Sequence, residues 1–223
     1  MATVFSTAYA GTGESLSSTY YMRRFYRSNA DARTATSRRQ YSNSELSNAD
    51  AVALRRAIKA LGSFTYDDDH ATNIRNSVSA FIDTYNNLLS SAGSSDDRKM
   101  TQSYKAMKKL TSEYEDSLDK IGITVNKDGT LSSRTALFAN ADISKFEKLF
   151  SKDADYIQRA TAYAKRIERR SDTLDIEEKK AALLAQQQKQ ATSTTATSSF
   201  AASLIPSTGL PADSTGSNIN VVL

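Results

Sequence analysis

Apolar residues recur every three or four positions along three long stretches of the chain, which is the spacing of one face of an α-helix. This pattern predicts helices over about residues 44–61, 69–91 and 97–121. Their apolar faces consist of Leu54, Ile58 and Leu61; of Ile74, Val78, Phe81, Ile82, Tyr85, Leu88 and Leu89; and of Met100, Tyr104, Met107, Leu110, Tyr114, Leu118 and Ile121. A helix of about 25 residues is roughly 37 Å long, so the third stretch indicates an elongated bundle.

Two further helices are predicted later in the chain. The shorter one carries Ile143, Phe146, Leu149 and Phe150, and the last one, from about Asp153 to Gln188, carries Ile157, Ala160, Ala164, Ile167 and Leu174. Gly62, Gly93 and Gly122 each follow an apolar-periodic segment, where a left-handed residue closes a helix. The predicted fold class is mostly α: an elongated antiparallel helical bundle, or rod, with one small β-hairpin and flexible termini.

The stretch "IGITVNKDGTL" differs from the helices around it because its residues alternate between apolar and polar. Its "NKDG" run is a turn signal in which Gly129 accommodates the positive φ of a hairpin turn. A β-hairpin is therefore predicted over residues 121–133. Because a two-stranded hairpin is marginally stable alone, we expect Ile123, Val125 and Leu131 to pack on the chain's own helices. The hairpin would also fix the register against a neighbouring subunit.

The two ends of the chain lack the helical period. Residues 1–43 contain six arginines and two acids, a surplus that equals the net charge of +4 of the whole chain. Residues 190–223 are rich in Ser, Thr and Ala and contain both prolines. Neither composition supplies enough apolar surface for a core. We therefore expect a basic N-terminal segment of residues 1–43, a helical rod of residues 44–189 and a disordered tail of residues 190–223.

Residues suited to catalysis or metal binding are few. The chain has no cysteine, which excludes disulfides and Cys-ligated metals. The acidic run before His70 resembles a metal cluster, but acids at the positive end of a helix dipole explain it better. The "NKDGT" run resembles a calcium loop, yet counting from Gly129 places Thr124 and Thr135 where an EF-hand requires acids. We expect no enzyme activity, no cofactor and no metal.

The hydropathy pattern argues against a membrane protein. Mean hydropathy is −0.51, and no run of 18 apolar residues exists, so no membrane span is predicted. The start of the chain lacks the apolar run and cleavage site of a secretory signal peptide. It is rich in Arg and Ser, like a mitochondrial transit peptide, but shows no sustained amphipathic period.

The segment "STYYMRRFYRS" interleaves aromatic residues with arginines. Such a segment can stack on bases and pair with phosphates, become ordered on docking to a protein partner, or pack back on the helices of its own chain. Nucleic-acid binding is disfavoured, because the rest of the chain is neutral and carries no nucleic-acid-binding motif.

Three motifs follow one another between residues 78 and 150: an apolar helix reading "VSAFIDTYNNLL", the hairpin reading "GITVNKDGTL", and a short helix ending in "LF". Their order and spacing resemble the C-terminal region of the bacterial flagellar cap protein family, the filament-capping hook-associated proteins, which are flagellar axial proteins. The resemblance covers about residues 70 to 188. The matching residues are Phe81, Tyr85, Asn86, Leu88, Gly122, Ile123, Asp128, Gly129, Leu131, Leu149 and Phe150.

The chain also departs from that family. Ser132, Ser133 and Arg134 stand where the family usually has an acid. The segment leading to "LF" is a few residues short, the large outer domains of a full cap protein are missing, and a Pro-containing tail follows the last helix.

The resemblance implies a structural, self-associating protein of flagellar axial type, which either caps or forms a filament. It implies an extracellular location, in a flagellum or flagellum-like filament, after export without a cleaved signal peptide. Its partners would be copies of itself, other flagellar axial proteins or an export chaperone. The alternative is a soluble adaptor or export-system partner that binds through its basic N-terminal segment.

Clustered apolar residues at both ends are the candidate assembly contacts: Tyr20, Tyr21, Phe25 and Tyr26 at the front, and Leu204, Ile205, Val221 and Val222 at the back. We expect them to order only against neighbouring subunits, which would supply the surface that each end lacks. The alternative is that they are incidental residues in flexible tails.

Overall fold

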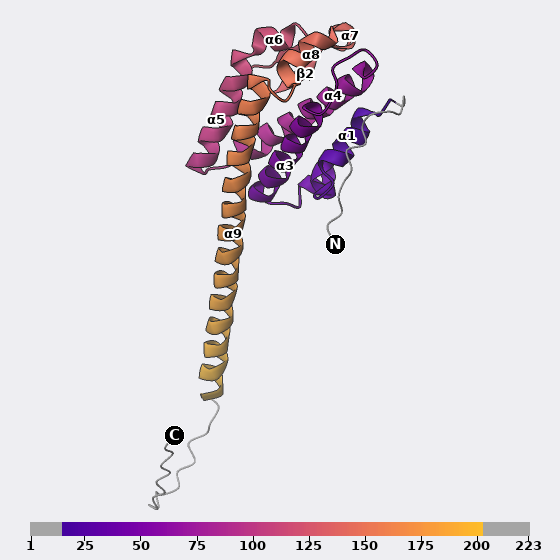
Figure 1. The fold of residues 1–223 in the computed structure, drawn as a ribbon. Helices are drawn as coiled ribbons and strands as arrows, with labels where there is room; N and C mark the ends of the chain where they lie inside the picture. The colour runs from indigo at the N-terminus through magenta and orange to yellow at the C-terminus, as the bar shows by residue number, and fades with distance from the viewer. Residues whose placement is uncertain (1–14, 203–223) are drawn as a thin grey trace, which may run out of the picture. The chain divides into compact units, whose positions relative to one another are not determined.

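The computed structural model describes residues 15–202, and their side chains as far as residue 190 (Figure 1). The chain divides into two compact units, residues 1–178 and 179–223. The first contains the described elements up to the first half of helix α9 (Asp155–Ala202), and the described part of the second is the rest of α9. The predicted fold class is confirmed, because the chain is mostly helical with one two-stranded hairpin.

Four helices of the first unit form an antiparallel bundle: α3 (Asn43–Leu61), α4 (Ala71–Gly93), α5 (Arg98–Glu113) and the start of α9. Side-chain bonds fix the directions. Asn43 at the start of α3 donates to the carbonyl of Ser94, just after α4, at 3.3 Å. Arg170 of α9 pairs with Asp97 before α5, whereas Tyr114 after α5 donates to Asp155 at the start of α9. Figure 1 shows α5 beside α9 and α3 beside α4.

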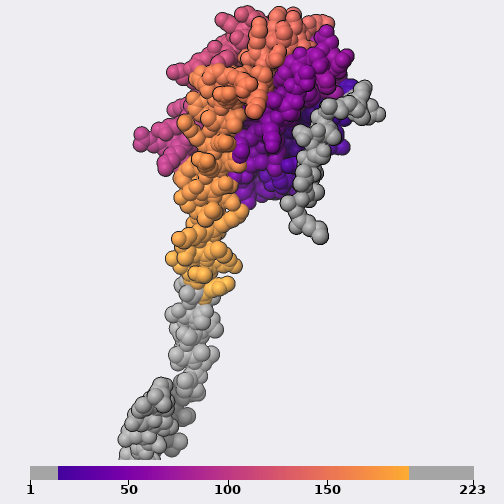
Figure 2. Space-filling view, viewed as in Figure 1, coloured from indigo at the N-terminus to yellow at the C-terminus, as the bar shows by residue number. Residues whose placement is uncertain are grey.

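Helix α4 lies at the centre of the core, with residues on most of its circumference buried. The ring of Phe81 packs edge-on against Phe150, with centroids 5.3 Å apart, and against Tyr156 of α9 at 6.5 Å. In the space-filling view, α8 (Ile143–Phe150) and the start of α9 lie directly against α4 (Figure 2). A helix that is apolar nearly all round is one that its neighbours enclose, which explains the density of apolar residues in this stretch.

The third predicted helix is interrupted. It consists of α5 and a short helix α6 (Glu115–Asp119), with Tyr114 between them at φ −104° and ψ 9°. The Tyr114 N–H bonds to Thr111, three residues back, rather than four. Its hydroxyl is held by Asp155 at 2.7 Å, and its ring lies 5.2 Å from that of Tyr156. Packing on the start of α9 thus overrides a continuous apolar pattern.

The predicted hairpin is confirmed. Strands β1 (Ile123–Val125) and β2 (Leu131–Ser133) pair antiparallel. The Gly129 N–H bonds to the carbonyl of Asn126 at 2.8 Å, and Gly129 has φ +87°. A short helix that the pattern did not predict, α7 (Thr135–Asn140), follows β2.

The expectation that the N-terminal segment orders only against neighbouring subunits is wrong. Residues 18–25 form helix α1 (Ser18–Phe25), followed by a 3₁₀ helix η1 (Ala30–Arg33) and a one-turn helix α2 (Ala35–Arg38). Tyr21, Phe25 and Tyr26 are each only 1% exposed in the core. Helical spacing puts Tyr21 and Phe25 on one face, and that face packs on α3 and α4. The segment packs back on its own chain.

The C-terminal boundary also differs from the expectation. Helix α9 does not give way to a disordered tail at residue 190 but continues to Ala202. Extending an existing helix costs far less than starting one, so Ser and Thr prolong it despite their weak propensity. Residues 203–223 lie outside the described residues, and with them the candidate contacts Leu204, Ile205, Val221 and Val222.

Candidate functional site

The residues that carry the family resemblance meet at the hairpin end of the bundle. Asn86 of α4 is the link: its side-chain amide donates to the carbonyl of Leu131 at 2.8 Å, and its amide oxygen accepts from the N–H of Leu131 at 2.8 Å. This pair of bonds has the pattern of a neighbouring strand, so Asn86 extends the ladder of β2 from a helix. The hairpin therefore packs on its own chain, as predicted.

Tyr85, the neighbour of Asn86, contacts the hairpin turn from inside the core. Its buried hydroxyl shares a 2.7 Å hydrogen bond with Thr111 of α5 and donates to the carbonyl of Gly129 at 3.4 Å. Burial raises the pKa of the Tyr85 phenol well above its ordinary value. The phenol therefore stays neutral, and its hydrogen bonds link α4 to α5 and to the turn.

The other motif residues supply the packing around these two. Phe81 and Phe150 form the aromatic contact described above, and Phe81 stacks on Tyr85 with centroids 6.2 Å apart. The apolar members that join them in the core are Leu88, Ile123, Leu131 and Leu149. Asp128 is the exception: it is exposed and accepts hydrogen bonds from the N–H and hydroxyl of Thr130 within the turn.

Two glycines of the motif are required by backbone geometry. Gly122 has φ +76°, and a Cβ there would lie 2.4 Å from the backbone nitrogen of Phe138. A Cβ on Gly129 would lie 2.5 Å from Lys108 Cε. Gly122 follows α6 in the left-handed conformation, as predicted. The prediction of a left-handed glycine is wrong for Gly62, which follows α3 at φ −66°. It is also wrong for Gly93, which is the last residue of α4 and does not have a positive φ.

A second constellation fastens the N-terminal segment to the bundle, and its centre is Asp50. This carboxylate is 0% exposed and accepts two bonds of 2.8 Å from the guanidinium of Arg38. It also accepts from the hydroxyls of Tyr26 and Ser91, each at 2.7 Å. A buried charge is tolerated where such partners satisfy it, so Asp50 joins α2, α1 and α4 through one group.

Sequence patterning did not identify Asp50, although a signal was present. Asp50 interrupts the small apolar run of α3 on a face that is otherwise buried. An acid at a core position indicates a buried partner. The partner itself was not predictable, since Arg38 and Tyr26 lie in a segment that lacks a sustained helical period.

The candidate contacts at the front of the chain are thus mostly unavailable to a neighbour. Tyr21, Phe25 and Tyr26 are buried in their own subunit, which corrects the expectation for these three. Tyr20 is 41% exposed and remains on the surface.

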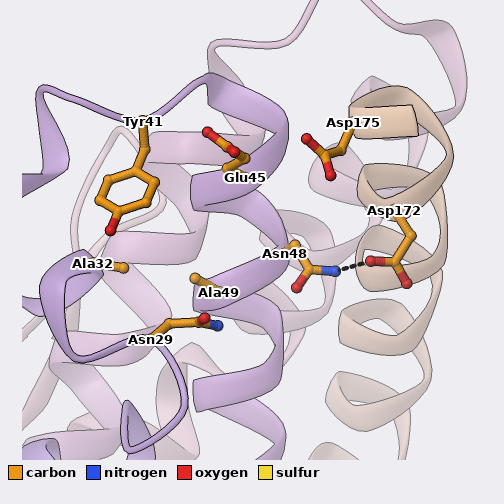
Figure 3. Close-up of a pocket in the computed structure, with 8 residues that line it drawn as sticks. All are labelled: Asn29, Ala32, Tyr41, Glu45, Asn48, Ala49, Asp172 and Asp175. Atoms are coloured by element: carbon orange, nitrogen blue, oxygen red, sulfur yellow. Dashed lines mark hydrogen bonds between the residues drawn. The ribbon is translucent and has the colours of Figure 1, made fainter. Parts of the chain in front are cut away.

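An acidic pocket of about 180 Å³ opens between the N-terminal segment, α3 and α9 (Figure 3). Asp172 and Asp175 of α9 face Glu45 and Asn48 of α3, and the Asn48 amide donates to Asp172. Burial, helped by the charges of Glu168 and Asp175, raises the pKa of the Asp172 carboxyl. Because Glu45, Asp172 and Asp175 all line this pocket, negative charge is concentrated on this side of α9. The lining residues are Asn29, Ala32, Tyr41, Glu45, Asn48, Ala49, Asp172 and Asp175.

His70 belongs to a local contact rather than a larger cluster. Its ring nitrogen Nδ1 lies 2.6 Å from a carboxylate oxygen of Asp67, three residues earlier. Across residues 15–190, no three His, Asp or Glu side chains converge where they could hold a metal ion.

No helix within residues 15–202 has the length and apolar character that a membrane span requires. No protein-family model matches the chain, and no curated protein or solved structure is significantly similar to it.

Proposed function

We propose that this chain is a non-enzymatic structural protein of flagellar axial type, which self-associates into a cap-like or filament-like assembly outside the cell. Its principal partners are copies of itself. Other axial proteins and an export chaperone are further partners under this proposal, and export proceeds without a cleaved signal peptide.

One observation supports the proposal most: the residues that match the cap-family pattern are joined physically as well as in sequence order. They come from α4, the hairpin and α8, yet nearly all of them contribute to one packed constellation around Asn86 and Tyr85. If the motifs followed one another by chance, their residues would have no reason to contact each other. Instead Asn86 makes the hydrogen bonds to β2 that a neighbouring strand would make, and the carbonyl of Gly129 accepts from the buried hydroxyl of Tyr85.

This arrangement gives the hairpin a mechanical role. Hydrogen bonds from Asn86 of α4 immobilise the outer edge of β2, while the turn residues Asn126, Lys127 and Asp128 remain exposed. A helical bundle alone has smooth sides along which neighbours slide. A rigid projection at one end gives a neighbouring subunit a fixed point, and so defines the register of assembly.

Negative-stain microscopy of the purified full-length protein over a range of concentrations tests the proposal. We expect rings or filaments that become more abundant as concentration rises. The matched control is Asn86→Ala, which leaves the N–H and carbonyl of Leu131 without their partner and loosens the hairpin. It should reduce the number or regularity of the assemblies. Isolated particles of the wild-type protein at every concentration would contradict the proposal.

The adaptor alternative keeps one supporting observation. Arg23 and Arg39 are exposed on the N-terminal segment and have no acidic partner among the described residues. The segment would bind an acidic partner through these two arginines while its aromatic residues Tyr21, Phe25 and Tyr26 stay in the core. A monomeric protein that binds an acidic partner, and loses that binding in Arg23→Ala/Arg39→Ala, would favour the adaptor.

A further inference from the structure

A basic groove of about 490 Å³ runs between α5 and α9 in the first unit. Four cations line it: Lys99 from α5, and Arg166, Arg169 and Arg170 from α9. The remaining lining residues are Gln102, Ser103, Ala106 and Thr173. Figure 1 shows α5 and α9 side by side. Its volume lies within the range of about 300–1,000 Å³ that is typical of ligand-binding clefts.

Three of these cations lack a counter-charge. Lys99, Arg166 and Arg169 are exposed, and none has an acidic partner within residues 15–190. Arg170 is different, because it pairs with Asp97 at 2.7 Å and lies 3.6 Å from Glu177. Arg166 is oriented by Tyr163, with its guanidinium carbon 5.5 Å from the ring centroid. Like charges gathered in one concave surface raise its potential and attract an anionic partner.

The opposite side of α9 carries the opposite charge. The acidic pocket places Asp172 and Asp175 beside Glu45 of α3. Asp175 follows Arg166 by nine residues, which is about two and a half turns of an α-helix, so the two side chains leave opposite sides of α9. Asp172, three residues after Arg169, lies between these two sides, so the acidic flank is centred on Asp175 and the basic flank on Arg166 and Arg170.

We propose that the basic groove binds the acidic pocket side of a second copy of this chain. The inference rests on the proposed self-association and identifies the surfaces that mediate it. Groove against groove and pocket against pocket would each bring like charges together. Only a heterologous contact, groove of one copy to pocket of the next, joins opposite charges.

The heterologous arrangement determines what forms. A contact between two different surfaces leaves one of each free at the ends, so it propagates into a ring or an open filament. Because the contact is largely electrostatic and exposed, added salt should weaken it, with a screening length of about 10 Å at 0.1 M and about 3 Å at 1 M.

Charge reversal on the full-length protein tests the contact. Arg166→Glu/Arg169→Glu reverses the groove, and Asp172→Lys/Asp175→Lys reverses the pocket side. Each variant alone should need at least about tenfold more protein to assemble, since facing like charges cost more than about 1.4 kcal/mol. An equimolar mixture should assemble again, because each reversed groove then meets a reversed pocket. Circular dichroism confirms that both variants keep the wild-type helix content and melting midpoint.

The outcomes separate this inference from the proposal beneath it. If the wild-type protein assembles and both variants do so at the same concentration, self-association stands and the groove contact is wrong. Loss of assembly in each variant without recovery in the mixture also overturns the contact. A wild-type protein that stays monomeric throughout removes the proposed function as well. Binding of a single-stranded oligonucleotide that the arginine variant loses, without any self-association, would assign the groove to nucleic acid instead.

Discussion

Replacing Asp50 by alanine should release the N-terminal segment from the bundle. The change removes the carboxylate that accepts from the Arg38 guanidinium and from the hydroxyls of Tyr26 and Ser91. Arg38 keeps only its bond to the backbone carbonyl of Ala32, which carries no charge. Only 16% of the Arg38 side chain is exposed, so its charge would remain largely buried without a counter-charge. Removing one partner of a buried pair costs about 3–5 kcal/mol. The charge-assisted bonds to Tyr26 and Ser91 overlap with this figure rather than adding to it, because all share one carboxylate.

Urea unfolding followed by circular dichroism measures the effect. With a slope of about 2 kcal/mol/M, a loss of about 3–5 kcal/mol lowers the midpoint by roughly 2 M. The matched control is Asp172→Ala, which removes a largely exposed carboxylate that accepts from the Asn48 amide and should change the free energy of unfolding by only about 0.5 kcal/mol. The double variant Asp50→Ala/Arg38→Ala should cost less than the sum of its two single changes, since it leaves no unpaired charge.

Limited trypsin digestion is a second measurement of whether the N-terminal segment is released. Release of the segment unfolds the backbone around its arginines, which trypsin must bind in an extended form, so cleavage before residue 40 should become faster in Asp50→Ala than in the control. If Asp50→Ala and Asp172→Ala shift the midpoint equally, the buried network does not hold the segment and the argument is refuted.

Three further predictions concern the core, the turn and acid stability. Phe81→Ala should cost about 3–5 kcal/mol in thermal or urea unfolding, because the ring is 0% exposed, and an unchanged melting midpoint would show that the core is wrongly assigned. Gly129→Val should cost about 1–3 kcal/mol through strain at φ +87° and leave most helical circular dichroism intact. Gly62→Ala has no such strain at φ −66° and meets only one close contact, 3.3 Å from Lys152 Cα, so it should cost less than Gly129→Val. The hydrogen bond from Arg170 lowers the pKa of Asp97 from 3.8 to about 2, so this group stabilises the fold above pH 4 and the contribution disappears as the pH falls from 4 to 2. Asp97→Asn should therefore flatten the acid-unfolding profile in that window, and an identical profile would contradict the assignment.

Periodicity predicted the elements that bury one continuous face. Helices α3, α4 and α8 have uninterrupted apolar spacing, and the hairpin has an alternating pattern with an Asp-Gly turn. Local rules are sufficient where pattern and turn chemistry agree. The Asn86 motif was visible in the sequence through a family resemblance, but its bonds to Leu131 became apparent only in three dimensions.

The errors arose where distant residues decide the structure. Helix α1 is short and rich in arginine, and its order depends on α3 and α4 and on Asp50, which lies 24 residues beyond Tyr26. The break at Tyr114 involves no glycine or proline and follows from contacts with Asp155 and Tyr156, about 40 residues away. The charged flanks of α9 were equally hidden, because a sequence read alone does not show which helices lie beside it.

The mass of the full-length protein in solution, measured by light scattering as a function of concentration, tests the central claim most directly. If the protein self-associates as proposed, we expect a weight-average mass that rises steeply with concentration above the 24.4 kDa of one chain. This mass should fall again when salt is added. A mass that stays at 24.4 kDa over the whole concentration range, at low and high salt alike, would contradict the claim.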